Sequence, residues 1–348
     1  MAVTQYKTLN ATSDISNTRT LLHESIPLTG TIVSGTYSDN NIKNYTHGQF
    51  QSVYDYPFLS SSANHIFDIS LGYDEGSALS ASTSTQNAKK INMYNQMSQV
   101  LLGFTGSTNA VKKFELDLTL DNSGLMNECY FLNFSRLITK DQIKKGTFSI
   151  TLGTGSYGNP FADAGASVKV LTDASASSTG GTLNTLGGDY GLLFTTDNVA
   201  RGLVFYESGV AILSTSSFDG MPAFFSSSAK TPGFEDVADV FVTSSITGAA
   251  DILRHRIQNI SFNNTTEINS TIYYCRVPSN DFNHSSNPTY LSSSTIRVKD
   301  VASDPPISYI TTVGLYASDG ELLAMAKLSE PLRKDPTNEL TLRVRLDY

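Results

Sequence analysis

Few residues of this sequence have the types and spacing that chemistry requires. One Gly-x-Gly-x-x-Gly motif, at Gly153, Gly155 and Gly158, follows a strand-like segment. Glycines in this pattern hold a dinucleotide pyrophosphate where they open a helix, whose N-terminus then meets the phosphates. Here Asn159-Pro160 follows, and no amphipathic helix does. The pattern therefore favours a chance match in a glycine-rich loop over a dinucleotide site.

Acidic pairs are the next candidates, because two carboxylates in a cleft can hydrolyse a glycosidic bond. Asp74-Glu75 and Glu235-Asp236 are such pairs, but no base or nucleophile lies near either of them in the sequence. Acids of this kind are usually solvated loop residues. Nothing in the spacing selects one pair from the 32 acidic residues, so an enzyme such as a depolymerase is disfavoured.

Cysteine and histidine give no metal-site spacing. Cys129 and Cys275 lie far apart in apolar stretches, which is typical of buried free thiols rather than of a disulfide. The histidines are scattered along the chain, at His23, His47, His65, His255 and His284. We expect no catalytic residues, no cofactor and no metal, and hence a protein that is not an enzyme.

The composition excludes several other classes. Of 348 residues, 39% are hydrophobic and only 16% are charged, while Ser, Thr and Asn together number 106. This aromatic-rich, weakly charged chain does not have the composition of a disordered protein. A net charge of −8 opposes nonspecific nucleic-acid binding. No apolar run approaches a membrane span, and the start has no basic and apolar signal segment, so we expect neither a transmembrane segment nor secretion.

Two helices are predicted. Residues 86–104 place Tyr94, Met97, Val100, Leu101 and Phe104 at three- and four-residue steps, with Ser84 or Thr85 as the N-cap and Gly103 near the end. This apolar stripe suits packing on the protein's own sheet better than binding to a partner. A second, short helix is predicted over 135–145.

Strand patterns dominate the rest of the chain. Alternation predicts half-buried strands over 114–120 and 339–347. Hairpins are predicted within 202–216, turning at Ser208-Gly209, and within 256–277, turning at Asn263-Asn264-Thr265. Asp319-Gly320, within 308–328, is the strongest hairpin signal in the chain.

These elements indicate a mainly β, multi-domain protein. We expect an extended N-terminal arm or short strands over 1–60 and a β-rich domain over 61–250. That domain carries the helix at 86–104 and a Gly/Ser-rich insertion over 154–188, which is loop-like in composition. Regular turn signals suggest a C-terminal β-sandwich-like domain over 251–348.

The C-terminal stretch, YITTVGLYASDGELLAMAKLSEPLRKDPTNELTLRVRLDY (309–348), resembles attachment modules of phage tail fibres. Segments 64–97, 202–216 and 282–290 resemble parts of virion structural proteins of contractile-tailed bacteriophages of the T4-like marine and cyanophage type. The resemblance implies a homo-oligomeric virion part of the tail, baseplate or neck, assembled in the host cytoplasm and contacting its own copies and other phage proteins. Predicted interface residues are Tyr309, Gly314, Tyr316, Asp319, Gly320, Leu342 and Val344.

Two alternatives within the virion stay open. Exposed tyrosines and Ser/Asn-rich loops would suit a receptor- or carbohydrate-binding tail module, although the absence of Trp disfavours sugar stacking. A capsid decoration protein is the other alternative, and the fibre-like C-terminal stretch favours the tail over it.

Overall fold

The computed structural model describes residues 6–27, 39–105, 110–138, 142–155, 160–161, 168–219, 221, 236–285, 290–292, 295–296, 301, 303 and 305–348. The protein is mainly β, as predicted. Its chain divides into two compact units. Unit 1 comprises Met1–Leu21 and Glu267–Tyr348, and unit 2 comprises Leu22–Thr266.

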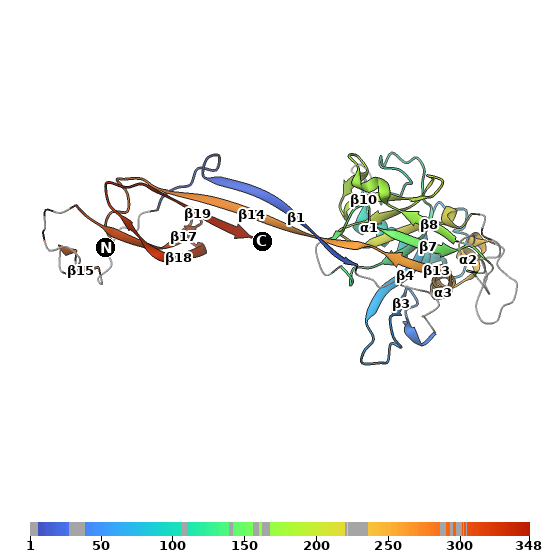
Figure 1. Cartoon of the computed structure of the whole chain (residues 1–348). Helices are drawn as coiled ribbons and strands as arrows, with labels where there is room; N and C mark the ends of the chain where they lie inside the picture. The colour runs from blue at the N-terminus through green and yellow to red at the C-terminus, as the bar shows by residue number, and fades with distance from the viewer. Residues whose placement is uncertain are drawn as a thin grey trace. The chain divides into compact units, whose positions relative to one another are not determined.

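Unit 2 is built on one large antiparallel sheet (Figure 1). Its strands follow the order β13, β7, β8, β10, β11, β12, β5, β4, β3, β2, and β9 also pairs with β10. Their bounds are β2 Ile42–Asn44, β3 Gln51–Tyr54, β4 His65–Tyr73, β5 Glu128–Asn133, β7 Ser149–Gly153, β8 Val168–Thr172, β9 Thr182–Thr185, β10 Gly188–Thr195, β11 Ala200–Phe205, β12 Val210–Ser214 and β13 Ile257–Ser261. Three short 3-10 helices, η2 (Asp39–Asn41), η3 (Ala174–Ser177) and η4 (Thr215–Phe218), lie beside these strands.

The central strands of this sheet are buried on both faces. Successive side chains of a strand point to opposite faces. In β5, Tyr130 and Leu132 join one hydrophobic core, whereas Cys129 and Phe131 join a second. All four side chains are almost fully buried, and β12 divides in the same way. The sequences of these strands are therefore continuous apolar runs, and apolar and polar residues do not alternate in them.

Three helices lie against the sheet: α1 (Asn87–Leu101), α2 (Val237–Thr243) and α3 (Ile246–Arg256). Helix α1 crosses β4 at Gly72, where an added Cβ would lie 2.6 Å from the Lys90 carbonyl oxygen and 2.7 Å from the Tyr94 nitrogen. Only glycine fits so close an approach of helix backbone to strand backbone. Tyr94 of α1 then enters the second core.

The predicted helix at 86–104 is confirmed, and its predicted apolar face is partly right, since Tyr94 and Leu101 are buried and Met97 is half-buried. The buried residues are Lys90, Tyr94, Ser98 and Leu101, whereas Val100 and Phe104 are exposed. The N-cap is Gln86, in the left-handed region, rather than Ser84 or Thr85, and Gly103 follows the helix end with a positive φ. Two polar side chains lie inside because each finds a carbonyl: Lys90 Nζ donates to Phe241 O and Ser244 O at the end of α2, and Ser98 Oγ donates to Lys112 O.

Three local predictions are wrong. The described part of 135–145 holds a turn and the short strand β6 (Gln142–Ile143), not a helix. Residues 114–120 form no strand. The segment bends, and the successive residues Phe114 and Glu115 are both buried instead of alternating. The region 256–277 is not a hairpin, because β13 pairs with β7 while β14 (Asn263–Val277) pairs with β6 and β19. The partners of β6 and β14 lie far away in the sequence, whereas Glu115 bonds locally, to the backbone of Asp121 and Asn122.

The hairpin within 202–216 is confirmed as β11 and β12, with Gly209 at φ 66° in the turn. The region 154–188, predicted as loop-like, contributes β8, β9 and the first residue of β10 to the sheet in its described part. Gly158 of the Gly-x-Gly-x-x-Gly motif lies outside the described residues. The carbonyls of Gly153 and Gly155 accept hydrogen bonds from the buried Arg256.

Unit 1 contains two antiparallel sheets and a short pair of strands. The first sheet orders β1 (Ile15–Pro27), β14 and β19 (Leu340–Asp347), and the predicted last strand is β19. The second is a hairpin of β17 (Ser308–Tyr316) and β18 (Leu322–Lys334), which turns at the predicted Asp319-Gly320. The short pair is β15 (Leu291–Ser292) with β16 (Thr295–Ile296).

Replacing Lys90 tests the contact between α1 and α2. We expect Lys90→Met to lower the free energy of unfolding at pH 7 by about 1–3 kcal/mol, because the carbonyls of Phe241 and Ser244 lose their donor in a buried place. Urea denaturation measures the change. Lys89→Met, on the exposed side of the same helix, is the matched control and should cost less than about 0.5 kcal/mol. Equal losses in the two variants would show that the buried contact has no special role.

The same contact predicts a pH dependence. Burial lowers the pKa of Lys90 to about 8, from the ordinary value of 10.5. Between these values the unfolded chain binds more protons at this position than the folded chain does, so the free energy of unfolding rises with pH. Relative to Lys90→Met, the wild-type protein should gain at most about 1.4 kcal/mol per pH unit above pH 8. Paired denaturation curves measure the difference, and a difference that stays constant or falls would contradict the assignment.

Candidate functional site: the exposed face of the β17–β18 hairpin

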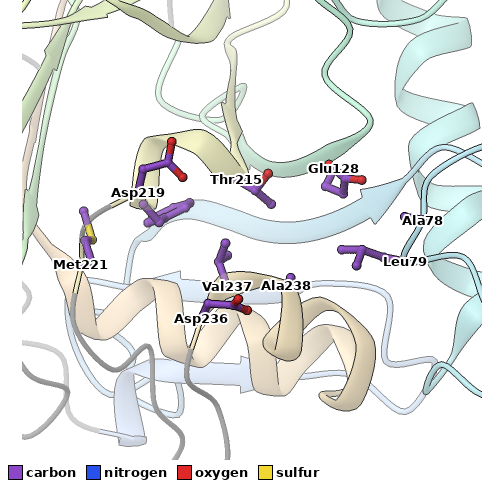
Figure 2. A pocket seen from close by; sticks show the side chains of 10 residues that line it. Ala78, Leu79, Glu128, Thr215, Asp219, Met221, Asp236, Val237 and Ala238 are labelled. Carbon is purple, nitrogen blue, oxygen red and sulfur yellow. The ribbon is translucent and has the colours of Figure 1, made fainter.

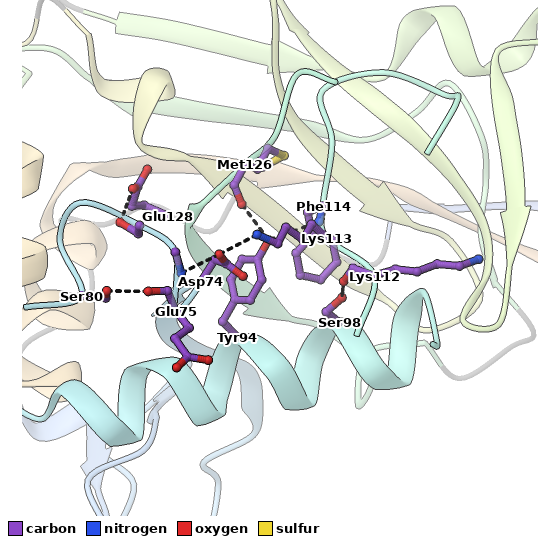
Figure 3. Close-up of polar contacts among 12 residues, drawn as sticks. Asp74, Glu75, Ser80, Tyr94, Ser98, Lys112, Lys113, Phe114, Met126 and Glu128 are labelled. Atoms are coloured by element: carbon purple, nitrogen blue, oxygen red, sulfur yellow. Dashed lines mark hydrogen bonds and ion pairs between the residues drawn. The ribbon is translucent and has the colours of Figure 1, made fainter. Parts of the chain in front are cut away.

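The carboxylate of Asp74, the first acidic residue after β4, has structural partners (Figure 3). Asp74, predicted to be a solvated loop residue, is buried, and its carboxylate accepts hydrogen bonds from Gly76 N and from Lys113 Nζ, each at 2.8 Å. Tyr94 donates to Met126 O and accepts from Phe114 N, and burial raises the pKa of its hydroxyl. These bonds fasten the segment before β5 to α1, so this polar cluster stabilises the fold.

A cavity of about 420 Å³ lies between β5, η4 and α2 (Figure 2). Three carboxylates line it, and each already has a partner. Glu128 accepts from Ser77 Oγ, and Asp219 forms an ion pair with Arg201 at 2.7 Å. Asp236 caps α2 through Asp239 N. The cavity therefore offers no carboxylate that is held ready for acid–base chemistry.

A third acidic group gathers Glu115, Asp117 and Asp121, whose carboxylate oxygens lie within 4.8 Å of one another. Both oxygens of the buried Glu115 accept backbone N–H groups, from Asp121 and Asn122, and Asp117 accepts from Thr119. Burial raises the pKa of Glu115. These hydrogen bonds explain the conformation of the loop without a bound ion. We therefore assign no ligand to the three carboxylates.

The β17–β18 hairpin carries exposed apolar side chains that no packing within the described residues explains. Beside the turn, Tyr316 pairs with Leu322, and further along Gly314 pairs with Met325 and Thr312 with Lys327. Directly paired residues share a face, so Leu322 and Met325 lie on the face of Gly314, and a Cβ added to Gly314 would lie 3.4 Å from Leu322 Cδ1. Leu323 is the extra residue where the register shifts beside Tyr316. Leu322 and Met325 on this face are 50% and 59% exposed. We call it the open face.

The opposite face of the hairpin is better covered. Leu315 is buried, and Val313, Ala324 and Ala326 are half-buried. Both faces of the hairpin are thus apolar, but the described residues cover only one of them. Contiguous exposed apolar residues on a soluble protein mark an interaction site. A two-stranded sheet is also marginally stable alone, so a further partner would stabilise it.

The structure brings five of the seven predicted interface residues onto this hairpin. Tyr309 and Tyr316 are about half exposed, and the Tyr6 ring packs edge-on against Tyr316 with centroids 5.2 Å apart. Gly314 is flanked by the Tyr316 ring. Asp319 and Gly320 form the turn, in which the Asp319 carboxylate accepts from Glu321 N.

The other two predicted residues lie elsewhere. Leu342 and Val344 belong to β19, where they pair with Cys275 and Tyr273 of β14. Val344 is buried, and Leu342 is half-buried. They contribute to the first sheet of unit 1 rather than to the open face.

Sequence reasoning missed the β18 side of the open face. Leu322 and Met325 sit in the run GELLAMAKL, which is apolar at both odd and even positions. Such a run normally indicates a strand covered on both faces. The run therefore indicates a covering partner, which the described residues do not supply.

No protein family, curated protein or solved structure matches the chain. Among the residues that the structure describes, none of the helices has the length and apolar character needed to cross a membrane.

The hairpin turn provides a local test of this site. Gly320 has φ 89°, where a β-branched residue is strained. We expect Gly320→Val to destabilise the hairpin by about 1–2 kcal/mol and to speed amide hydrogen exchange in β17 and β18, leaving exchange in unit 2 unchanged. Ser318→Val, in the same exposed turn without a positive φ, is the control. Unchanged exchange in the hairpin of Gly320→Val would refute the turn assignment.

Proposed function

We propose that this chain is a non-enzymatic structural subunit of the virion of a contractile-tailed bacteriophage, located in the tail, baseplate or neck. There it provides assembly and fibre-attachment contacts. One observation carries the proposal: the segment that resembles tail-fibre attachment modules is the segment that forms the open face. The resemblance and the uncovered apolar surface thus coincide in β17 and β18.

The chemistry of the chain supports an assembly role. A virion subunit must stay soluble until it assembles and must then bury surface against its neighbours. Hydroxyl and amide side chains suit both states, because they hydrogen-bond either to water or to a partner at a lower desolvation cost than charges. The carboxylates that line the 420 Å³ cavity are occupied by Ser77, by Arg201 and by the start of α2, which favours a structural role over an enzymatic one.

Incorporation into particles tests the proposal. Particles produced with the wild-type chain should contain it in fixed stoichiometry by mass spectrometry, and a cryo-EM map should place it in the tail or neck. Leu322→Asp puts a charge on the open face, so this variant should be lost from particles. Glu339→Lys, at an exposed position before β19, should be incorporated normally.

Four outcomes would contradict the proposal. The wild-type chain could be absent from purified particles, or the purified protein could turn over a polymeric substrate. Adsorption of the isolated protein to host cells would favour a receptor-binding module instead. Particles with intact tails and a fragile head, produced without the chain, would place it in capsid decoration.

A further inference from the structure

Lys334, the last residue of β18, is a buried lysine without a carboxylate partner. Its side chain is fully buried, and its ammonium donates to three oxygens: Asn283 Oδ1 at 2.6 Å, Asp335 O at 2.8 Å and Ser279 O at 3.2 Å. All three oxygens are uncharged, because they belong to backbone carbonyls or to a carboxamide. Within the described part of the chain, no ion pair neutralises this ammonium. A buried charge without a counter-ion is costly, so a change that removes it is favourable.

The carboxamide of Asn283 is held against this ammonium. Its Nδ2 donates to Ser279 O at 2.7 Å, so one carbonyl oxygen accepts from both side-chain nitrogens. Lys334 Nζ lies 2.6 Å from Asn283 Oδ1, which is bonded to Cγ at about 1.23 Å. The distance from Nζ to Cγ is therefore at most about 3.8 Å, the sum of these two lengths. Reacting atoms in productive geometries lie about 3–3.5 Å apart.

Other contacts of the backbone hold the two side chains in place. Ser308, the first residue of β17, pairs with Lys334 across the hairpin. The hydroxyl of Ser308 also donates to the carbonyl of Phe282, the residue before Asn283. The segment that carries the carboxamide is thus fastened to the strand pair that carries the amine. Such preorganisation raises the effective concentration of one group at the other by orders of magnitude.

We propose that Lys334 and Asn283 join in an intramolecular isopeptide bond. Lys334 Nζ bonds to Asn283 Cγ, and the bond from Cγ to Nδ2 breaks. Nζ gives up two of its three protons, and the departing Nδ2 takes both and leaves as an ammonium ion. The total charge is unchanged, and the step needs no oxidant, reductant or further reactant. A neutral amide replaces the buried positive charge.

The bond closes residues 283–334 into a covalent ring within unit 1. A cross-link restricts the unfolded chain, so it stabilises the folded unit. The attacking form of a lysine is its neutral amine, and the bond therefore forms faster at alkaline pH. This inference goes beyond the proposed function, because an assembly role needs no covalent bond.

Intact mass spectrometry tests the bond on the purified full-length chain. After incubation at alkaline pH, the wild-type chain should weigh less than its sequence by one ammonia. A tryptic digest should contain a branched peptide that joins Asn283 to Lys334, and trypsin should no longer cut after Lys334. Lys327→Met removes an exposed lysine of the same strand and, as the matched control, should keep the loss of ammonia.

Two variants remove the reacting groups. Asn283→Ala lacks the carboxamide and should keep its full sequence mass. Lys334→Arg retains a buried cation with several donors, but arginine stays protonated and does not attack a carbonyl, so this variant should also keep its full mass. Circular dichroism shows that each variant is folded, and Lys334→Arg separates the covalent bond from the packing of a cation at this position.

Two results would overturn the inference. One is a wild-type chain that keeps its full sequence mass at every pH and incubation time. The other is a loss of ammonia that persists in Lys334→Arg, because the loss would then come from another residue. Neither result bears on incorporation into particles, so the isopeptide bond and the proposed function fail separately.

Discussion

The structure depends on one constraint: the apolar faces of its sheets must be covered by other parts of a protein. In unit 2 the central strands are apolar on both faces, so one core must form on each side of the sheet, and helices and distant strands supply them. This requirement brings α1 onto Gly72 at backbone contact and places Lys90 inside the protein, where the end of α2 provides its acceptors. In unit 1 the same requirement is met on one face of the β17–β18 hairpin and left unmet on the other.

The contrast between the units connects fold and function. In unit 2 the carboxylates of the 420 Å³ cavity and the buried Glu115 have hydrogen-bond or ion-pair partners inside the chain. Unit 1 leaves Leu322 and Met325 in water. Burial of these side chains against a partner would be favourable. A subunit of an assembly is expected to have such a surface.

The sequence predicted those elements whose conformation is set by neighbouring residues, and it failed where distant residues set the conformation. The Asp319-Gly320 hairpin and the hairpin at Gly209 were predictable because turn conformation is encoded in two residues. The predicted hairpin over 256–277 failed because β14 finds its partners about 70 to 120 residues away. The burial of Lys90 was not predictable, because charge normally excludes a residue from a core and its two carbonyl acceptors come from a helix about 150 residues later. The open face was half predicted, through β17 and the turn, whereas β18 was missed because its apolar run suggested cover on both faces.

Chemical protection of Met325 tests the central claim, that the open face is an association surface, most directly. Met325 is exposed in the single chain, so peroxide should oxidise it readily in dilute solution. The account predicts that Met325 oxidises more slowly in purified particles than in the free chain, while the half-buried Met97 of α1 reacts at the same rate in both. Equal rates of Met325 oxidation in particles and in the free chain would contradict the account.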